Sequence, residues 1–319
     1  MGAKVFGYAL PPPTSPSMFE LCEAAHRMTS RFGDLRQSEG IASFVKESQP
    51  EIILHLAAQS LVTEGYDDPI GTYASNVMGT VHLLEAARYC GSVRAIVVVT
   101  SDKCYENREW HWPYRENETL GGHDPYSNSK ACTELVATAF QQSFLKDCGI
   151  NLATARAGNV FGGGDWSKNR LIPDLLSAFA NGRAATLRRP QSVRPWQHVL
   201  EPLAGYLMLA EKLEQDASFA TPFNFGPSEL ESISVEVMAN RLCQHWGGNA
   251  SFTCEYSNFP HEAGQLRLDS SLARHRLGWH PQLGIDKGLH LTVDWHKAWI
   301  SGKNMHAFTC SQIMEYITS

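Results

Sequence analysis

A tyrosine and a lysine spaced four residues apart are the pair in this sequence best suited to chemistry. Tyr126 and Lys130 follow the turn-forming run Gly121-Gly122-His123-Asp124-Pro125, and a helix beginning there would place both side chains on one face. A phenol has a pKa near ~10, and a neighbouring ammonium favours the phenolate and lowers that pKa. The pair therefore suits removal of a hydroxyl proton while hydride leaves the same carbon. Because Tyr-x-x-x-Lys also occurs by chance, its surroundings must support this interpretation.

The elements that would position this pair are strands alternating with helices. We expect strands at 5–10, 51–59, 93–100, 151–156 and 223–226, and helices at 41–48, 76–89, 126–146 and 199–213. This alternation predicts an α/β fold with a doubly wound parallel sheet. Ligands of such sheets bind at the carboxyl ends of the strands. The run Ser101-Asp102-Lys103 and the residues Ala57, Ala58 and Asn159 would lie there.

Composition excludes several classes of protein. The chain has 319 residues, 43% hydrophobic and 19% charged, and a formal net charge of −6, which indicates a soluble globular protein. With no Lys/Arg-rich block, nucleic acid is not an expected partner. The eight cysteines show neither C-x-x-C nor metal-ligand spacing, so we expect no metal site and reduced thiols in the cytoplasm. The apolar runs are too short to span a membrane, and we recognise no signal peptide.

The motifs resemble those of the extended short-chain dehydrogenase/reductase family. The general set is His55-Leu-Ala-Ala-Gln59, Asn76, Tyr126-x-x-x-Lys130, Arg156-x-x-Asn159-Val160 and Arg194-Pro-Trp-Gln-His198. A more specific set is similar to the CDP-glucose 4,6-dehydratases: Thr100-Ser-Asp-Lys-Cys-Tyr105, Arg115-Glu-Asn-Glu118, Asp124-Pro-Tyr-Ser-Asn-Ser-Lys130 and Gly158-Asn-Val-Phe-Gly-Gly-Gly-Asp-Trp166. The resemblance covers nearly the whole chain.

The resemblance implies a fold and an activity. The fold would be a Rossmann-type NAD-binding domain (residues 1–160 plus about 196–226) with a smaller C-terminal α/β domain (about 161–195 plus 227–319) for the nucleotide sugar. The activity would be NAD-dependent dehydration of CDP-D-glucose to CDP-4-dehydro-6-deoxy-D-glucose, a step of deoxysugar biosynthesis such as that of lipopolysaccharide O-antigen. Family members pair as homodimers through the helices that start here at Asn76 and Tyr126. Two alternatives remain: an epimerase or reductase of the family, and an impaired chain that only binds nucleotide sugar.

The resemblance also implies catalytic roles. Tyr126 would take the 4-hydroxyl proton, Lys130 would lower the tyrosine pKa and hold the nicotinamide ribose, and Ser101 would bind the 4-oxygen. Where the better-known dTDP-glucose dehydratases have an Asp-Glu pair, this sequence has Asp102 and Lys103. We expect them to serve as acid and base in the loss of water, or else to form a salt bridge that only positions their loop. Cys104, with no neighbouring base, is expected to be a small apolar filler.

Further residues are implied in binding. The cofactor set is Asp34, Leu35, Leu56, Ala57, Ala58, Gln59, Asn76 and Thr100, with Tyr126 and Lys130. The substrate set is Asn159, Arg170, Arg194 and His198, in which forked guanidinium donors suit a diphosphate. Asp34 could instead be a turn residue, Asn76 a helix N-cap, and the arginines solvated surface charges.

The sequence departs from the family at its beginning. The family opens with a strand, a Gly-x-x-Gly-x-x-Gly turn and a helix whose N-terminus receives the NAD pyrophosphate. This sequence begins at the equivalent of the second strand, so we expect the first strand and helix to be missing. The absent strand would lie between the strands at 5–10 and 52–56. The chain is then expected to be a fragment, or to bind NAD poorly.

Overall fold

The central element is a four-stranded parallel sheet. A computed structural model describes residues 2–228, 231–255 and 264–319. The strand order is β3-β4-β5-β9, with the ranges β3 (Ile52–His55), β4 (Ala95–Val99), β5 (Asn151–Ala157) and β9 (Phe223–Phe225). Val97 in β4 lies opposite Leu54 in β3 and Ala153 in β5. The predicted parallel α/β sheet is confirmed.

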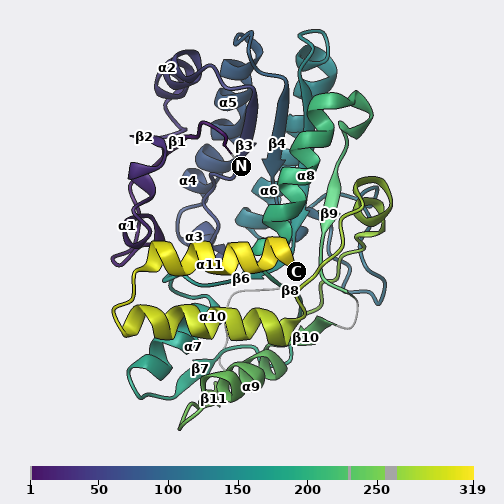
Figure 1. The fold of residues 1–319 in the computed structure, drawn as a ribbon. Coiled ribbons are helices and arrows are strands. Elements are labelled where there is room, and N and C mark those ends of the chain that lie inside the picture. The colour runs from purple at the N-terminus through teal and green to yellow at the C-terminus, as the bar shows by residue number, and fades with distance from the viewer. Residues whose placement is uncertain (1, 229–230, 256–263) are drawn as a thin grey trace.

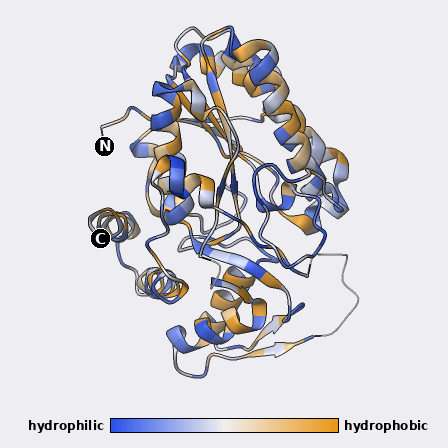
Figure 2. Cartoon of the chain, turned by 90° about the vertical axis from the view of Figure 1, so that its right-hand side faces the viewer, coloured by the Kyte–Doolittle hydropathy of each residue, from blue (hydrophilic) through white to orange (hydrophobic). Residues whose placement is uncertain are grey.

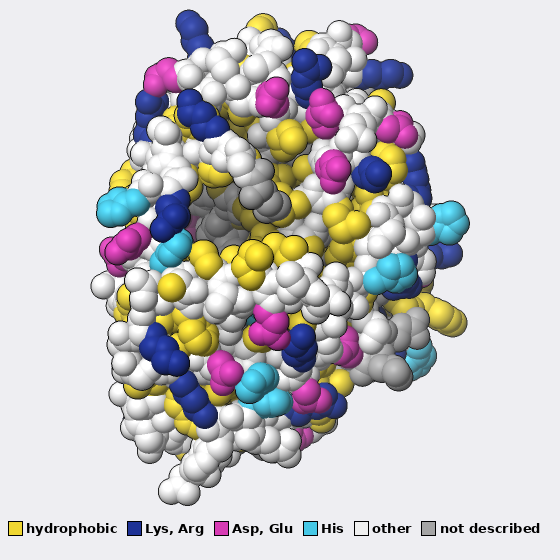
Figure 3. Space-filling model, in the orientation of Figure 1, with side chains coloured by type: hydrophobic (Ala, Val, Ile, Leu, Met, Phe, Trp, Pro, Cys, Tyr) yellow, Lys and Arg dark blue, Asp and Glu magenta, His cyan; other side chains and the backbone are white. Residues whose placement is uncertain are grey.

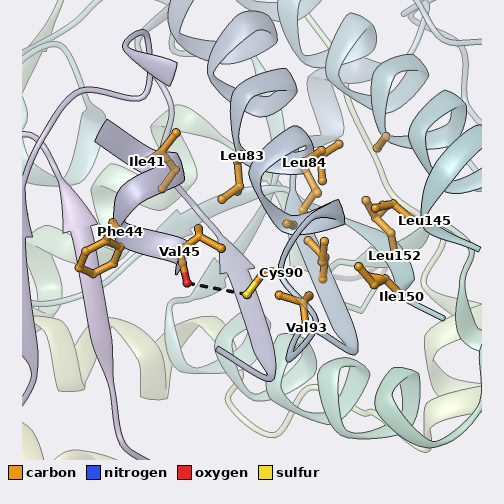
Figure 4. Close-up of a cluster of buried hydrophobic side chains, with 14 residues drawn as sticks. Ile41, Phe44, Val45, Leu83, Leu84, Cys90, Val93, Leu145, Ile150 and Leu152 are labelled. Atoms are coloured by element: carbon orange, nitrogen blue, oxygen red, sulfur yellow. Dashed lines mark hydrogen bonds between the residues drawn. The ribbon is translucent and has the colours of Figure 1, made fainter. Parts of the chain in front are cut away.

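Helices cover both faces of this sheet, as the alternation of side chains along β4 requires. Ile96 and Val98 pack on one face against α2 (Ser38–Ser48), α5 (Gly79–Arg88) and the end of α6 (Pro125–Phe140). Figure 4 shows this core. Ala95 and Val97 pack on the other face against α8 (Leu200–Gln215). In Figure 2 the hydrophobic residues accordingly gather on the strands and on the helix faces turned toward them.

A separate pair of strands stands beside the sheet. β1 (Phe6–Ala9) and β2 (Thr29–Phe32) pair in parallel, but within the described residues β1 does not bond to β3. Phe6 and Tyr8 pack on the same core as Ile53 of β3, so both pieces share one helical layer. Ile52 and Leu54 of β3 remain 42% and 37% exposed, although a strand inside a parallel sheet is normally buried. The predicted interruption between these strands is therefore present.

The face seen in Figure 3 is hollowed above helix α11, and hydrophobic side chains surround the hollow. The segment nearest the N-terminus, drawn purple in Figure 1, runs down the left side of this region through α1 (Met18–Leu21). Pro11-Pro12-Pro13 forms the connection from β1 toward α1. Proline has no amide hydrogen, so this connection cannot continue a strand ladder.

A second group of elements lies below the sheet in Figure 1. Its strands are β6 (Asn159–Phe161), β8 (Val193–His198) and β10 (Ser232–Ser234) in one small sheet, and β7 (Ala185–Leu187) with β11 (Phe252–Cys254) in another. Its helices are α7 (Leu171–Ala180), α9 (Val235–Trp246), α10 (Ile285–Ile300) and α11 (Met305–Thr318). They enclose a core of their own, which includes Leu175, Trp196 and Leu289. The exact division into two domains stays a prediction.

Short helical segments complete the chain. They are η1 (Ala24–His26), α3 (Val62–Asp67), α4 (Pro69–Tyr73), η2 (Ala74–Met78), η3 (Asp102–Cys104), η4 (Gln141–Leu145), η5 (Ala217–Phe219) and η7 (Ala273–Leu277). Two predicted helices are thus longer than their α-helical parts, since η2 precedes α5 and η4 follows α6. Within the described residues, no helix combines the length and apolarity that a membrane span requires.

Candidate active site

Local capping fixes where α6 begins and therefore where its reactive side chains lie. Asp124 Oδ1 accepts a hydrogen bond from the Ser127 amide at 2.9 Å, and its Oδ2 accepts one from Ser127 Oγ at 2.5 Å. Pro125 occupies the first helical turn, where its missing N–H costs nothing. Tyr126 and Lys130 consequently lie one turn apart, and both are buried.

The carboxyl end of β4 supplies the groups that face this helix. Lys130 Nζ donates to the Val99 carbonyl at 3.2 Å. Ser101 caps the short helix η3, because its Oγ accepts from the Lys103 amide at 3.2 Å and donates to Asp102 Oδ1 at 3.0 Å. The Ser101 and Tyr126 side chains are hydrogen-bonded to each other. The strand end thus brings serine, aspartate, tyrosine and lysine together.

Burial controls the electrostatics of the Tyr126–Lys130 pair. It raises the pKa of Tyr126 to about 12, although the hydrogen bond between Tyr126 and Ser101 opposes this change. It lowers the pKa of Lys130 to about 8, opposed by the negative charge of Glu134. That Lys130 lowers the pKa of Tyr126 stays a prediction, because burial has the larger effect on the tyrosine here and Lys130 Nζ donates to the Val99 carbonyl.

Asp102 has an unusual environment for a carboxyl group. Its side chain is 2% exposed, and its Oδ2 atom has no hydrogen-bond partner among the described residues. Desolvation raises its pKa, and the charge of Lys103 and the hydrogen bond from Ser101 only partly offset this. A carboxyl group in such a setting is biased toward its protonated form, as the role of an acid requires.

A cavity of about 500 Å³ joins these groups to the second part of the chain. All five predicted catalytic residues line it, as do six predicted binding residues: Leu56, Ala58, Thr100, Asn159, Arg170 and Arg194. Asp34, Leu35, Ala57, Gln59, Asn76 and His198 are not among the lining residues. One concave site therefore contains most of the residues that the sequence singled out.

Asn76 acts through its neighbours rather than on the cavity. Its Oδ1 accepts from the Gln59 amide at 2.8 Å, and its Nδ2 donates to the Gln59 carbonyl at 2.9 Å and to Ser129 Oγ at 2.8 Å. This residue lies inside a helical stretch, so of the two readings left open it holds the loop backbone and does not cap a helix. It fixes the loop after β3 against α6.

Two other predicted residues have local partners. Asp34 Oδ2 accepts from the Arg36 guanidinium at 2.6 Å, while Oδ1 accepts from the Arg36 amide, which is the geometry of a turn residue. His198 is buried against the ring of Phe161 at 5.9 Å, and burial lowers its pKa to about 4. Cys104 is fully buried in an apolar cluster, as predicted for a filler.

The cavity also contains residues that the sequence did not reveal. Ser60 and Asp165 accept hydrogen bonds from Arg170 at 2.7 and 3.4 Å, and Tyr66, Arg188 and Tyr206 contribute to the wall. Tyr66 lies on α3, Tyr206 on α8 and the others on separate loops, and these segments converge only in the folded chain. The sequence signals for them were the motif Gly158–Trp166, which contains Asp165, and the cluster of arginines at 188–194.

The family model described as GDP-mannose 4,6 dehydratase matches residues 18–292. The chain belongs to this family. It is also 50% identical over its whole length to the CDP-glucose 4,6-dehydratase of Salmonella typhimurium, covering 90% of that protein. The resemblance to the CDP-glucose 4,6-dehydratases is thereby confirmed.

Solved structures of the wider family share the fold. The dTDP-glucose 4,6-dehydratase DesIV from Streptomyces venezuelae, determined with NAD bound, superposes with a TM-score of 0.74 at 24% identity, covering 86% of this chain and 81% of that one. The UDP-glucose 4-epimerase of Thermotoga maritima gives 0.78 at 19% identity, covering 93% of this chain and all of that one. The predicted Rossmann-type architecture is confirmed, and dehydratases and epimerases of the family share it.

Proposed function

We propose that this protein dehydrates a nucleoside diphosphate hexose, CDP-D-glucose, to CDP-4-dehydro-6-deoxy-D-glucose with NAD as cofactor. The observation that carries the proposal is the meeting of Ser101, Tyr126 and Lys130 with Asp102 and Lys103 in one cavity. The first three are the groups for oxidation at an alcohol carbon, and the last two are an acid and a base for elimination. The 50% identical relative supports the choice of CDP-glucose.

The residues present fit one half of NAD better than the other. Lys130 and Tyr126 share the cavity with Leu56 and Ala58, a mixture of donors and apolar surface suited to the ribose and nicotinamide ring. A pyrophosphate needs several backbone donors, and the connection after β1, Pro11-Pro12-Pro13, has no amide hydrogens to offer. The nicotinamide end therefore fits, whereas the connection after β1 does not provide a pyrophosphate cradle.

When bound, NAD supplies the hydride acceptor for C4 and the hydride donor for C6. Tyr126 removes the 4-hydroxyl proton, and Ser101, hydrogen-bonded to that tyrosine, binds the same oxygen and stabilises the charge that develops there. Lys130, one helical turn from the tyrosine, donates from its ammonium to the Val99 carbonyl. The 4-keto group formed in this step acidifies the C5 proton and so prepares the elimination.

Elimination then needs a base for the C5 proton and an acid for the departing 6-hydroxyl. Asp102, whose pKa burial raises, is suited to hold the proton for the hydroxyl. Lys103 lines the same cavity and takes the C5 proton. The aspartate–lysine pair can move one shared proton between its members when the site is closed to water.

The arginines of the second group of elements suit the diphosphate of the substrate. Arg170, Arg188 and Arg194 line the cavity, and Arg194 is nearly fully buried. Guanidinium groups bind phosphates with two parallel donors. We assign Arg194 and Asn159 to the diphosphate, with Arg170 held ready by Ser60 and Asp165.

A second candidate activity is epimerisation or reduction of a nucleotide sugar, since an epimerase shares the fold. The buried Asp102 next to Lys103 argues against it, because neither activity needs an acid and a base for elimination. Incubation with CDP-glucose and NAD, followed by mass spectrometry and NMR, distinguishes the candidates. Dehydration gives a product lighter by one water with a 6-methyl group, epimerisation gives an isomer, and a chain that only binds gives unchanged substrate.

We also propose that the protein forms a homodimer through α5, α6 and their neighbouring segments. Leu135 on α6, Phe144 on η4 and Tyr89 after α5 are large hydrophobic residues left exposed, and a helix that is apolar on two sides needs a second surface.

All eight cysteines are free thiols, which supports a reducing, cytoplasmic setting for the protein.

A further inference from the structure

A buried carboxylate one turn beyond Lys130 organises the strand ends beneath the site. Glu134 is 1% exposed and accepts four hydrogen bonds. The donors are Thr100 Oγ1 at 2.5 Å, Thr154 Oγ1 at 2.7 Å, and Arg156 through Nε at 2.9 Å and Nη2 at 2.7 Å. Both oxygens are thus satisfied by groups from β5 and from the end of β4.

The same network extends away from the site. Arg156 Nη1 donates to Tyr105 Oη at 2.8 Å and to the Glu116 carbonyl at 2.9 Å, and Tyr105 donates to Asn224 Oδ1 at 2.7 Å. The ends of β4, β5 and β9 are therefore joined through one ion pair. Burying such a pair has a large desolvation cost, so it is weak evidence for stability alone, and a second role should be sought.

Two contacts connect this network to Lys130. Thr100, which bonds to Glu134, directly follows Val99, whose carbonyl accepts from Lys130 Nζ at 3.2 Å. Lys130 and Glu134 are also four residues apart on the sheet-facing side of α6, where opposite charges attract. The carboxylate thus acts on the lysine both through the strand end and through space.

The other groups around Lys130 do not supply a comparable negative charge. His55 on β3 is bonded to Thr80 at 2.9 Å, and its pKa is lowered to about 3 by burial and then by Lys130, so it is neutral. Burial raises the pKa of the Cys104 thiol on η3. Burial raises the pKa of Tyr126, which lies one helical turn from Lys130, and Arg156, which pairs with Glu134, is positive.

We propose that Glu134 is a positioning residue for Lys130: its carboxylate keeps the lysine an ammonium and, through Thr100, fixes the strand end that supplies the lysine's acceptor. The inference rests on the proposed role of Lys130 in catalysis. A lysine buried without an anion would lose its proton near neutral pH, and a neutral amine would not stabilise the phenolate of Tyr126. Glu134 thereby keeps Lys130 protonated, and the site active, up to a higher pH.

The test is a titration of Lys130 in the protein without cofactor or substrate. With lysine labelled by ¹³C at Cε, the Lys130 resonance is assigned from its absence in Lys130→Arg, and its titration midpoint is compared between the wild type and Glu134→Gln. Because Glu134 raises the pKa of Lys130, its removal should move the midpoint to lower pH by about one unit. An unchanged midpoint in folded protein overturns the proposal.

A second pair of variants keeps the test decisive if Glu134→Gln, which leaves Arg156 unpaired, does not fold. The double variant Glu134→Gln with Arg156→Met removes both buried charges, which proteins often tolerate, and should also show a lowered midpoint. Thr100→Val and Thr154→Val each remove one hydrogen bond to Glu134 and retain its charge. Thr100→Val should lower kcat about tenfold, while Thr154→Val should stay within about twofold of wild type.

Equal losses in the two threonine variants would mean that Glu134 acts only as a structural ion pair, and would overturn the positioning role. The titration needs no turnover, so it separates this inference from the proposed function. A shifted midpoint in a protein that does not dehydrate CDP-glucose supports the role of Glu134 and contradicts the activity. An unshifted midpoint in a protein that dehydrates CDP-glucose supports the activity and contradicts the role of Glu134.

Discussion

The reactive residues of this protein are defined by burial as much as by their identity. Tyr126, Lys130 and Asp102 are each more than nine-tenths buried, and in every case desolvation moves the pKa toward the neutral form. The titratable groups of such a site therefore lie close together in a region poor in water. Small changes of charge, such as those made by substrate or cofactor, can then redistribute them.

We expect Asp102, the acid of the elimination, to lower the stability of the folded protein. The pKa of Asp102 is higher in the folded than in the unfolded protein. At pH 7 the unfolded chain therefore carries a carboxylate that folding must neutralise or desolvate, which lowers the free energy of unfolding. This cost vanishes below the unfolded pKa of about 3.9, where the carboxyl is protonated in both states. Asp102→Asn should therefore raise Tm by about 1–3 °C at pH 7, and the gain should disappear near pH 4. Thermal unfolding at the two pH values checks this. An equal decrease in Tm at both values would contradict it.

Lys103→Met separates oxidation from elimination. Without the base for the C5 proton, oxidation at C4 should proceed but water should not be lost, and turnover should decrease by about 10²–10⁴-fold. Reduced cofactor should then accumulate on the enzyme, visible by its absorbance, and solvent deuterium should not enter C5. Wild-type turnover would refute the catalytic role. Loss of cofactor reduction as well would indicate that the lysine only positions its loop.

At the scale of elements, the interrupted ladder between β1 and β3 is the feature with the clearest consequence. Both strands present an edge without a strand partner in the described residues, and the apolar side chains of β3 are exposed beside it. Unpaired edges of this kind are usually covered or protected. A strand placed there would bury those side chains and bond to both neighbours.

Adding a strand, a glycine-rich turn and a helix before Lys4 should therefore raise NAD affinity and Tm together. The strand would complete the sheet, and the helix N-terminus would supply the pyrophosphate donors that Pro11-Pro12-Pro13 cannot provide. Calorimetry with NAD and thermal unfolding measure the two effects, with a Gly/Ser segment of equal length as the control. Equal NAD affinity in both versions would contradict the expectation and would leave the ribose and nicotinamide contacts as the whole binding site.

Elements with a local signal could be predicted from the sequence. The strand at Ala95–Val99 and the helix beginning at Pro125 follow from a β-branched run and from an Asp-Pro cap, and the catalytic run at the end of β4 follows from them. The partnership of Glu134 with Arg156 could not be predicted, since it joins residues on a helix and a strand through burial alone. The raised pKa of Tyr126 was missed for the same reason: desolvation depends on the packing of distant segments such as α8.

At the scale of the whole molecule, the cavity lies between two parts that the chain builds in alternation. In the small sheet of β6, β8 and β10, strand β6 directly follows β5 of the central sheet, and β8 directly precedes α8, which packs on that sheet. Residues such as Asn159 and Arg194 are thereby brought to the same cavity as Ser101. Motion between the parts would change the access of water to the site. This arrangement suits a reaction whose intermediates must not escape.

The proposed dimer predicts a specific response to substitution. Leu135 on α6 is 59% exposed, and Leu135→Glu would bury a charge in the interface. Sedimentation at micromolar concentration should show a dimer for the wild type and a folded monomer for this variant. Met314→Glu, on the equally exposed face of α11, is the matched control and should remain a dimer. A well-folded wild-type monomer would count against the interface.

The central claim is that one site oxidises C4, eliminates water and reduces C6 of the same hexose. The most direct measurement uses CDP-glucose carrying deuterium at C4, incubated with the protein and NAD in ordinary water, with the product analysed by NMR. The account predicts a 4-keto-6-deoxy product whose methyl group carries the deuterium, because the hydride taken from C4 returns to C6 without leaving the site. A product without a new methyl group, or a methyl group free of deuterium, would contradict it.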